Sequence, residues 1–411
     1  MPLKSPRQMT HLIHHPYQAP DGFAAVPTAI YKASTVIFPT VHAMQTRNWR
    51  IGNNYSYGLH GTPTTFTLQE RLASLEGGLY ALLAPSGLAA ISLVNLALLS
   101  QGDEVLIPQN SYGPTIDMVK QVLGRFGVAL RMYDPLQPEQ LTVLIQANTR
   151  LIWLEAAGSV TMEFPDLSVL IQVARQHQVL TVLDNTWGAG IAFNAFDLPA
   201  GQSVDLTMHA LTKYPSGGAD VLMGSIVTRN EAIHKQLKAT QQLLGLNVAA
   251  NDAEMVLRGL PTIALRYHAQ DTAARTLATW LAIQPEIAQV LHPALPDAQG
   301  HVAWRATCGA TDTDRTSGHA AGIFSVIFQP KITVEQVHRF CEQLELFKLG
   351  YSWGGPMSLV MPYRLSSIRP EEHGGVPAHL HEGSLVRLCI GLEDVADLQA
   401  DLAQALAAMM D

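Results

Sequence analysis

The sequence predicts an α/β fold with a mostly parallel central sheet, followed by a smaller C-terminal α+β domain. Short apolar strands alternate with helical segments between residues 63 and 262, which is typical of a parallel sheet covered on both faces. Beyond this region, helical periodicity dominates and strand signals are few. A chain of 411 residues, 47% hydrophobic and 15% charged, is long and apolar enough to build both parts.

Residues 1–62 are predicted to be an N-terminal arm. They are rich in Pro, Gly, Asn, His and aromatic residues, and they carry no regular hydrophobic pattern. Such a segment cannot bury a core of its own. We therefore expect it to pack on the main body or on a neighbouring subunit.

Residues 63–262 are predicted to form the large domain around the sheet. Gly77-Gly78 ends its first helix, and Pro85-Ser86-Gly87 begins the next. The predicted strands are 79–84, 104–108, 130–133, 151–155, 179–184, 205–208 and 221–228. The predicted helices are 67–76, 87–99, 114–126, 167–177, 232–245 and 251–258. Binding residues in such a sheet gather beyond the carboxyl ends of the strands.

Residues 263–411 are predicted to form the smaller domain. A helix at 264–284 is long enough to bridge the two domains. Strands are expected at 322–328 and 385–390, and further helices at 333–343 and 393–410.

Composition excludes several classes of function. The net charge of −8 argues against nucleic acid or an anionic membrane as the main partner. Cys308, Cys341 and Cys389 are odd in number and far apart, which argues against a disulfide framework or a thiolate zinc site. The 16 histidines are scattered, and no signal-peptide core or membrane-length apolar run is found. We expect a soluble, cytoplasmic protein without a metal ion.

Lys213 and Asp184 are the first candidates for chemistry. Lys213, one of 8 lysines, follows an apolar strand, and Asp184 ends the strand-like run 179–184. A buried lysine loses solvation of its charged form, so its pKa falls and its amine becomes nucleophilic. Pyridoxal phosphate requires an amine for its aldehyde and an anion for its ring nitrogen. Taken singly, a surface lysine and a helix-capping aspartate are the commoner fates of these residue types.

Further candidates fall in the same crevice. Ser86-Gly87, at the start of an apolar helix, offers backbone N–H groups and a hydroxyl to an anion, and Thr212 adds a second hydroxyl. Tyr112 follows the strand 104–108, where its ring can stack on a flat cofactor or be buried in the core. Arg387 interrupts an apolar strand, so it needs a carboxylate, either from the protein or from an amino-acid substrate.

These segments together resemble the Cys/Met-metabolism family of pyridoxal phosphate enzymes, within fold type I. The most specific motifs are Leu-Asp-Asn-Thr-Trp (183–187), Leu-Thr-Lys-Tyr (211–214) and Tyr-Ser-Trp-Gly-Gly (351–355). The resemblance extends over nearly the whole chain and is greatest to the bacterial cystathionine β-lyase branch. It implies an aspartate aminotransferase-like fold and pyridoxal 5′-phosphate as the cofactor.

The resemblance also implies a role for each candidate. Lys213 would bind the cofactor aldehyde and move protons, Asp184 would hold the ring nitrogen, and Tyr112 would stack on the ring and assist proton transfer. The remaining implied cofactor contacts are Ser86, Gly87, Leu88, Thr186 and Thr212. The implied substrate contacts are Arg387, Ser352 and Trp353. Tyr57 would act as a catalytic residue in a neighbouring subunit's site, because the family is typically a homotetramer of dimers that share active sites.

The implied reaction is β-elimination of cystathionine, or of a related cysteine thioether, in methionine biosynthesis. Many γ-acting relatives have Ser-Pro-Ser-Asn-Pro after the glutamate, whereas this chain has Glu155-Ala-Ala-Gly-Ser. The missing asparagine, together with Trp353, favours a β-lyase. A γ-acting enzyme, such as a cystathionine γ-lyase, a γ-synthase or a methionine γ-lyase, is the nearest alternative.

Leu59 departs from the family pattern. The family usually has Tyr-x-Arg there, and the arginine reaches a neighbour's cofactor phosphate, whereas this chain has Tyr57-Gly58-Leu59. His60, Arg47 and Arg50 are the candidates to replace that charge. The departure motivates a second alternative, a non-catalytic binding paralogue. A nucleotide-dependent dehydrogenase is disfavoured because no Gly-x-Gly-x-x-Gly follows a strand.

Overall fold

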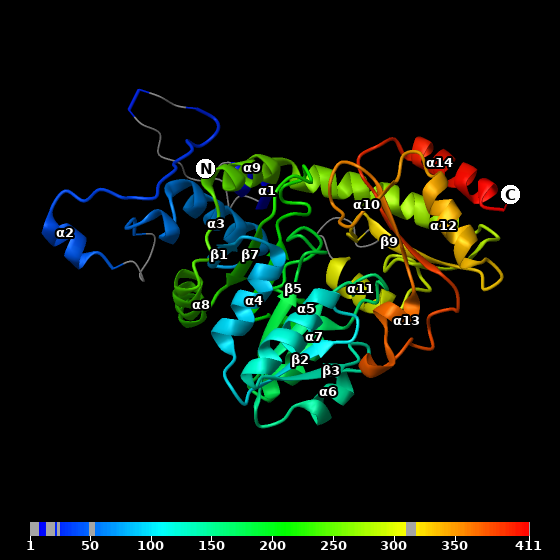
Figure 1. The fold of residues 1–411 in the computed structure, drawn as a ribbon, viewed down its shortest axis with the longest axis horizontal. Helices are drawn as coiled ribbons and strands as arrows, with labels where there is room; N and C mark the ends of the chain where they lie inside the picture. Colours follow the sequence, from blue (N-terminus) through cyan, green and yellow to red (C-terminus); the bar gives the residue numbers. More distant parts are fainter. Residues whose placement is uncertain (1–7, 14–20, 23–24, 49–53, 310–317, 411) are drawn as a thin grey trace.

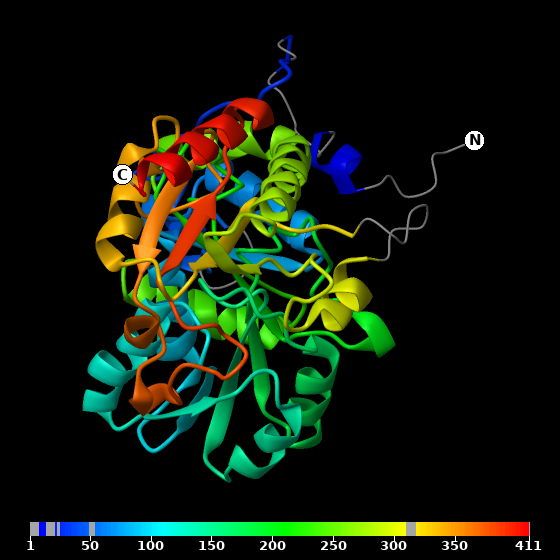
Figure 2. The ribbon, with the colours of Figure 1, turned by 90° about the vertical axis from the view of Figure 1, so that its right-hand side faces the viewer.

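The computed structural model describes residues 8–13, 21–22, 25–48, 54–309 and 318–410. Two sheets, each with helices packed against it, form the body of the molecule (Figure 1, Figure 2). The larger sheet has seven strands in the order β1-β7-β6-β5-β4-β2-β3, and the smaller has five in the order β10-β11-β12-β9-β8. The predicted α/β class, with a mostly parallel sheet and a smaller C-terminal α+β part, is confirmed.

The larger sheet is parallel except at one strand. β7 pairs antiparallel with both β1 and β6, and every other neighbouring pair is parallel. The strands are Tyr80–Ala84 (β1), Glu104–Pro108 (β2), Ala129–Tyr133 (β3), Thr149–Glu155 (β4), Leu180–Asp184 (β5), Leu206–Ala210 (β6) and Gly224–Thr228 (β7). The strand predicted at 221–228 therefore begins only at Gly224.

Both faces of the larger sheet are buried. Leu82 and Ala84 of β1 belong to one core, whereas Ala81 and Leu83 belong to the other, because successive strand residues point to opposite faces. The helices contributing to the first core are Gly87–Leu98 (α4), Gly113–Asp117 (α5) and Glu231–Leu243 (α8). Those contributing to the second are Gln8–Ile13 (α1), Pro63–Glu76 (α3), Pro138–Leu144 (α6), Leu167–Gln176 (α7) and Ala250–Gly259 (α9).

The segment after Tyr112 is not the single regular helix predicted at 114–126. α5 is followed by a π-helical turn at Met118–Val122 and a 3-10 turn at Leu123–Phe126. Gly127 ends the segment with φ 78°, a left-handed conformation that a residue without Cβ adopts easily. Periodicity predicted the place of the helix but not its changes of hydrogen-bond spacing.

The smaller sheet contains strands that the sequence pattern did not reveal. Its strands are Ile287–Leu291 (β8), Ile323–Phe328 (β9), Lys348–Leu349 (β10), Leu359–Tyr363 (β11) and Leu385–Cys389 (β12). Only β9 and β12, which are buried along their whole length and mostly apolar, were predicted. β8 is only partly buried along its middle, and β11 contains Pro362, so neither shows a regular strand pattern.

A long helix links the two sheets. Ile263–Leu281 (α10) runs from the larger sheet's helices to the smaller sheet, where it packs with Val334–Gln343 (α12) and Val395–Ala408 (α14) (Figure 1). The remaining helices of this part are His301–Cys308 (α11) and Leu365–Ile368 (α13). Within the described ranges, no helix has both the length and the apolar character needed to cross a membrane.

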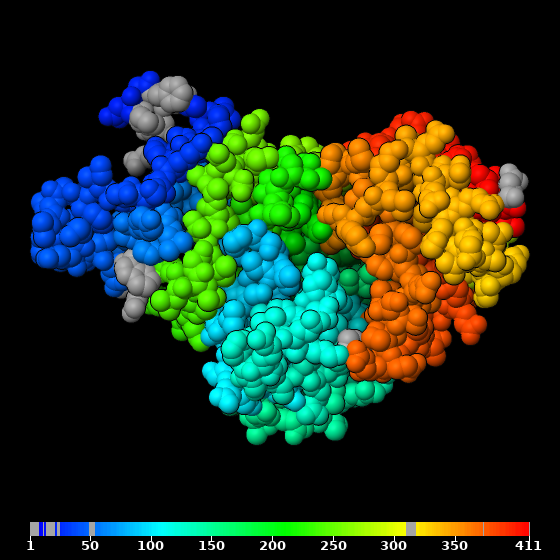
Figure 3. Space-filling model, in the orientation of Figure 1, coloured from blue at the N-terminus to red at the C-terminus, as the bar shows by residue number. Residues whose placement is uncertain are grey.

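Residues 25–48 of the N-terminal arm project from the body, whereas α1 packs against it (Figure 1, Figure 3). The arm helix Val41–Thr46 (α2) has no buried residue, and the apolar side chains of Val26, Ile37 and Met44 are exposed. The N–H of Tyr31 donates a hydrogen bond to the Thr64 hydroxyl at 2.8 Å and anchors the arm near the start of α3. Of the two expected packing partners, the main body therefore does not cover residues 25–48.

Candidate active site

The carboxyl ends of neighbouring strands bring together the central predicted site residues. Asp184 ends β5 and Glu155 ends β4, and the two are direct partners in the parallel ladder. Lys213 lies just beyond the end of β6. β6 pairs with β5 on the side opposite to β4. Strand ends of a parallel sheet open on one edge, so these side chains share one crevice.

The surroundings of the Lys213 amine favour its neutral form. Its Nζ donates a hydrogen bond to Ser352 Oγ at 2.8 Å and lies 5.6 Å from the centre of the Trp353 ring. Burial, followed by the positive charge of Arg387, lowers the pKa of Lys213 to about 8, although Asp184 acts in the opposite direction. An amine with this pKa is partly uncharged near neutral pH, as a nucleophile or a base requires.

The loop that carries Trp353 is held close to Lys213 by an unusual backbone. Ser352 has φ 117°, in a region that favours glycine, and Gly354 has φ 76°. A Cβ atom on Gly354 would lie 3.0 Å from the backbone nitrogen of Tyr214, so glycine permits this close approach. The Trp353 ring meets the buried Tyr214 ring edge-on, at 5.6 Å between centres. The C-terminal part thus supplies one wall of the crevice.

Asp184 is buried and oriented by the residues that follow it. Its Oδ1 accepts a hydrogen bond from the N–H of Thr186 at 3.0 Å, and the Thr186 hydroxyl accepts one from the N–H of Ala210 at 3.0 Å. Burial raises the pKa of Asp184, against the effects of the Thr186 hydrogen bonds and of His209. A carboxyl group in this position favours a cationic or proton-donating partner.

A buried contact between a histidine and a carboxylate, which the sequence did not indicate, lies close to Asp184. His209 Nδ1 is 2.8 Å from Glu76 Oε1, and Asn185 Nδ2 donates to Glu76 Oε2 at 2.7 Å. Glu76 and His209 lie 133 residues apart, at the end of α3 and within β6. No local pattern could have joined them.

The predicted phosphate seat lies at the N-terminus of α4. Ser86 caps this helix, since its Oγ accepts a hydrogen bond from the N–H of Ala89 at 3.0 Å. Gly87 packs closely on β6, where an added Cβ would lie 2.8 Å from Ala210 Cβ. An added Cβ on Gly224 of β7 would lie 2.4 Å from the Ser86 carbonyl oxygen. The first turn of α4, whose N–H groups lack intrahelical partners, is thus seated directly on two strands.

Thr212 and Leu88 are the two remaining residues predicted to contact the phosphate. Thr212 Oγ1 is 3.4 Å from both the backbone oxygen and the backbone nitrogen of Met223, so its hydroxyl is oriented by the segment before β7. Leu88, the second residue of α4, is 40% exposed.

Tyr112 projects from a turn that Glu155 holds. Glu155 Oε2 accepts hydrogen bonds from the N–H of Tyr112 and from Ser111 Oγ, both at 2.8 Å. Burial and the neighbouring Asp184 raise the pKa of Glu155 to about 8. Burial, then Asp184 and Glu155, raise the pKa of Tyr112, whereas Arg387 lowers it, so the phenol faces the charged residues of the crevice. The 44% exposed ring is therefore not a core tyrosine.

Arg387 is a buried cation of the smaller sheet. It belongs to β12, and its guanidinium carbon lies 5.4 Å from the centre of the Tyr363 ring. Its Nε is buried and has no hydrogen-bond partner among the described residues, and none of their carboxylates forms an ion pair with it. Burying a guanidinium in this way is costly unless a ligand carboxylate pairs with it. Of the two interpretations left open by the sequence, this favours the external carboxylate.

The predicted site residues of the N-terminal arm, unlike Lys213 and Asp184, contact other residues of the arm. Tyr57 is 48% exposed, and its ring neighbour is His60, at 6.4 Å between centres. Arg47 stacks on Phe38, with its guanidinium carbon 5.8 Å from the ring centre, and Arg50 lies outside the described residues. His60 Nδ1 pairs with Ser56 Oγ at 2.8 Å. Tyr57 is therefore half exposed on the arm, and its one ring contact among the described residues is with the arm itself.

Comparison with known proteins places this arrangement in a family. The model described as "Cys/Met metabolism PLP-dependent enzyme" matches residues 9–407. The chain belongs to this family. The cystathionine β-lyase of Salmonella typhimurium is 37% identical to the chain, over 93% of the chain and 94% of the relative. The L-alanine/L-glutamate racemase of Wolbachia pipientis is 33% identical to the chain, over 92% of the chain and 91% of the relative. The crystal structure of metB from Corynebacterium glutamicum has a TM-score of 0.84 and 27% identity, and the match covers 98% of both chains.

As a member of the Cys/Met metabolism family, the protein uses pyridoxal phosphate, and its crevice fits this cofactor. The amine of Lys213 and the buried carboxyl of Asp184 supply the two groups that the aldehyde and the ring nitrogen need. The start of α4, seated closely on Ala210 and Gly224, offers N–H groups to a phosphate. The resemblance seen in the sequence and the predicted cofactor are both confirmed.

No role was predicted for Glu155 from the sequence, although it holds the turn that carries Tyr112. It ends a predicted strand beside the one that ends in Asp184, and that was the available signal, since carboxyl ends of adjacent parallel strands meet. Its contact with the Tyr112 turn, by contrast, depends on the tertiary structure.

Proposed function

We propose that the protein is a carbon–sulfur lyase that performs β-elimination on cystathionine and related cysteine thioethers, giving homocysteine or another thiol, pyruvate and ammonia. The observation that carries the proposal is the buried Arg387, whose Nε has no partner among the described residues, beside an amine with a pKa of about 8. A fixed cation next to a base suits an α-amino acid, which carries a carboxylate beside an acidic Cα–H bond. The similarity to a cystathionine β-lyase supports the choice of substrate.

The cofactor would be held by residues from both ends of the crevice. Lys213 would be the attachment point, Asp184 would hold the ring nitrogen, and Tyr112 would cover the ring. The phosphate contacts are assigned to Ser86, Gly87, Leu88 and Thr212, with Thr186 beside Asp184. When bound, pyridoxal phosphate supplies an electron sink for the negative charge left on Cα.

The substrate would be oriented by its carboxylate. Arg387 binds it bidentately, and Ser352 and Trp353 line the side on which the thioether lies. Because Ser352 accepts a hydrogen bond from Lys213 Nζ at 2.8 Å, it also holds the amine toward the substrate. This fixes the Cα–H bond within reach of one base.

Two proton transfers complete the reaction. Lys213 Nζ takes the proton from Cα, and the Cβ–sulfur bond then breaks with both electrons leaving on sulfur. Lys213 Nζ or the Tyr112 hydroxyl gives the sulfur a proton, so a neutral thiol departs. Water converts the three-carbon remainder to pyruvate and ammonia.

A second copy of the chain would complete the site. The arm exposes Val26, Ile37 and Met44, and Tyr57 is half exposed, so a neighbouring subunit is the natural cover for this segment. We propose a homotetramer in which the arm of residues 1–62 contributes Tyr57 to a neighbour's site. Within each subunit, the large domain would be 63–262 and the C-terminal domain 263–411.

A panel of thioethers with product identification tests the proposal. Cystathionine, cystine and a cysteine conjugate are supplied to the cofactor-loaded protein, and the 2-oxo acid is identified by mass spectrometry. Pyruvate with homocysteine from cystathionine is the expected result, and relative rates across the panel define the preferred thioether. Production of 2-oxobutyrate would instead assign γ-elimination, and loaded protein without turnover of any thioether would support a non-catalytic paralogue.

A further inference from the structure

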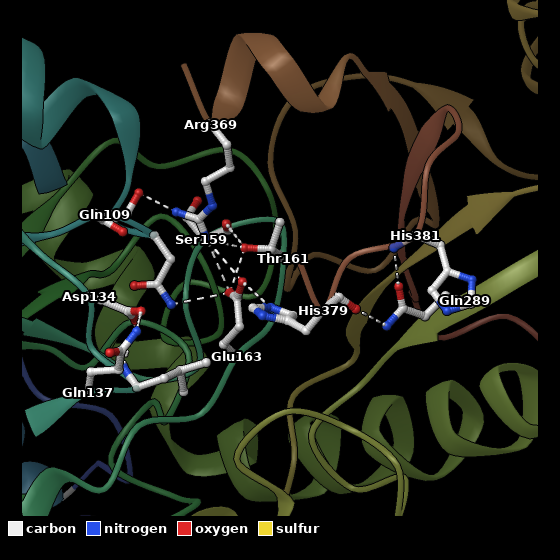
Figure 4. Close-up of polar contacts among 12 residues, drawn as sticks. Gln109, Asp134, Gln137, Ser159, Thr161, Glu163, Gln289, Arg369, His379 and His381 are labelled. Carbon is white, nitrogen blue, oxygen red and sulfur yellow. Dashed lines mark hydrogen bonds and ion pairs between the residues drawn. The ribbon is translucent and has the colours of Figure 1, made fainter. Parts of the chain in front are cut away.

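A second buried polar cluster, centred on Glu163, lies at the boundary between the two parts of the chain (Figure 4). Arg369 Nη2 lies 3.1 Å from both carboxylate oxygens, and His379 Nε2 lies 3.2 Å from Oε1. Thr161 Oγ1 donates at 2.6 Å and Asn110 Nδ2 at 3.2 Å. Five contacts from four residues thus converge on one carboxylate.

Glu163 is ionised in this setting. Burial opposes ionisation, but the hydrogen bond from His379, the charge of Arg369 and the Thr161 hydroxyl outweigh it and lower the pKa of Glu163 to about 2. Arg369 is 4% exposed and Glu163 3%, so the ion pair is almost fully removed from water. Burying an ion pair gives little net stability over an apolar pair of similar size. A contribution to fold stability alone therefore does not explain why these charged residues are buried together.

The cluster joins segments that are distant in sequence. Arg369 and His379 both come after α13, in the C-terminal part of the chain. Gln109 and Asn110 come directly after β2 of the larger sheet. The guanidinium of Arg369 reaches across and donates to the Gln109 carbonyl oxygen (Figure 4). Glu163 itself lies 206 residues from Arg369. The C-terminal part is therefore tied directly to the loop that leads to Tyr112.

That loop is fixed at each of its residues. Arg369 binds the Gln109 carbonyl, and Glu163 binds the Asn110 side chain. The Asn110 carbonyl accepts a hydrogen bond from the N–H of Ser159 at 2.7 Å. Glu155 then binds Ser111 and Tyr112, as described above. The backbone is anchored from both sides of the loop, while the ring of Tyr112 remains half exposed toward the crevice.

We propose that Glu163 and Arg369 are positioning residues, which set the place of the Tyr112 ring over the cofactor through Gln109 and Asn110. The role assigned to Tyr112 rests on the proposed function, but the mechanical link does not. Asn110 is two residues from Tyr112, so a shift at the Glu163 cluster displaces the ring-bearing turn. Catalytic rates depend steeply on such shifts.

Two variants break the link at different points. Asn110→Ala removes the connection between Glu163 and the turn, and it leaves the carboxylate with its three other partners. The double variant Glu163→Gln, Arg369→Met removes both buried charges together, so no uncompensated charge remains to unfold the protein. Glu372→Gln is the matched control, because it breaks the exposed Lys120–Glu372 ion pair (3.1 Å), which joins the same two parts of the chain.

The readouts separate positioning from stability. Amide hydrogen exchange of a peptide covering 109–117 is measured in cofactor-free protein, and the visible circular dichroism of the bound cofactor is measured in loaded protein. We expect faster exchange and a changed dichroism in both variants, and a fall in kcat of about tenfold to a hundredfold with KM nearly unchanged. The control should match the wild type in all of these, because its ion pair is exposed.

A lower melting temperature without changes in exchange, dichroism or kcat would mean that the cluster only stabilises the fold, and would overturn the inference. Unchanged values throughout would overturn it as well. A wild-type protein that forms 2-oxobutyrate would instead refute the proposed β-lyase function alone, because exchange and dichroism do not depend on which bond of the substrate breaks.

Discussion

Replacing Gly224 with alanine would insert a methyl group between strand β7 and the first turn of α4. The added Cβ would lie 2.4 Å from the Ser86 carbonyl oxygen and 3.0 Å from Ala90 Cβ. An ordinary contact needs at least 3.4 Å, and the clashing oxygen is a backbone atom that cannot rotate away. The helix start and the strand must therefore separate by about 1 Å, as is usual when a closely packed site is overfilled.

The size of the effect follows from this displacement. Overpacking of this kind costs about 1–3 kcal/mol of folding free energy. A shift of about 1 Å at the N-terminus of α4 removes at least one hydrogen bond to a bound phosphate, and a bond to a charged group contributes about 1.5–3 kcal/mol. Cofactor affinity should therefore fall by about 10-fold to 150-fold.

The assay is a titration of cofactor-free protein with pyridoxal phosphate, followed by absorbance in the visible range. Gly350→Ala is the matched control, because its Cβ would make an ordinary contact, 3.5 Å from Leu359 Cδ2. Thermal unfolding of both variants separates the loss of cofactor affinity from the loss of fold. An affinity of Gly224→Ala equal to that of the control would refute the assignment of the α4 N-terminus as the phosphate seat.

Three further predictions concern Lys213 and its surroundings. Lys213→Ala should abolish turnover and the visible absorbance of bound cofactor while the protein stays folded by circular dichroism, and full activity in this variant would rule out the assigned role. In cofactor-free protein, acetylation of Lys213, measured by peptide mass spectrometry, should rise with pH through a midpoint near 8. The reason is that the pKa of Lys213 in the folded protein lies below the ordinary 10.5. A midpoint near 10.5 would contradict the argument that burial lowers this pKa. Tyr214→Phe should lower the free energy of unfolding by about 1–3 kcal/mol in a denaturant titration, because the buried N–H of Gly322 loses the hydroxyl that accepts its hydrogen bond at 2.7 Å. The control Tyr351→Phe, at an exposed tyrosine, should leave the free energy of unfolding unchanged.

Much of the larger sheet could be predicted from local sequence. Its strands are short apolar runs with both faces buried, and its helices begin at capping residues such as Ser86, so short-range patterns carry the information. The positions of Asp184 at the end of a strand and of Lys213 just after one could be predicted in the same way. Only two of the five strands of the smaller sheet were predicted, because strands such as β8 and β11 are stabilised by pairing with neighbours and lack a regular pattern of their own.

The amino-acid sequence by itself determined the fold class, through its alternating strand and helix patterns, and the cofactor, through motifs that resemble the family. It also predicted the residues that would meet the cofactor. Only the tertiary structure decided how those residues are held. Glu155 accepts a hydrogen bond from the N–H of Tyr112, and Glu163 forms an ion pair with Arg369, 206 residues away in the sequence. Burial also lowers the pKa of the Lys213 amine, and it leaves Arg387 Nε without a hydrogen-bond partner among the described residues. Contacts of this kind depend on which distant segments share a dry interior, where an unpaired charge is costly, and no local pattern records that.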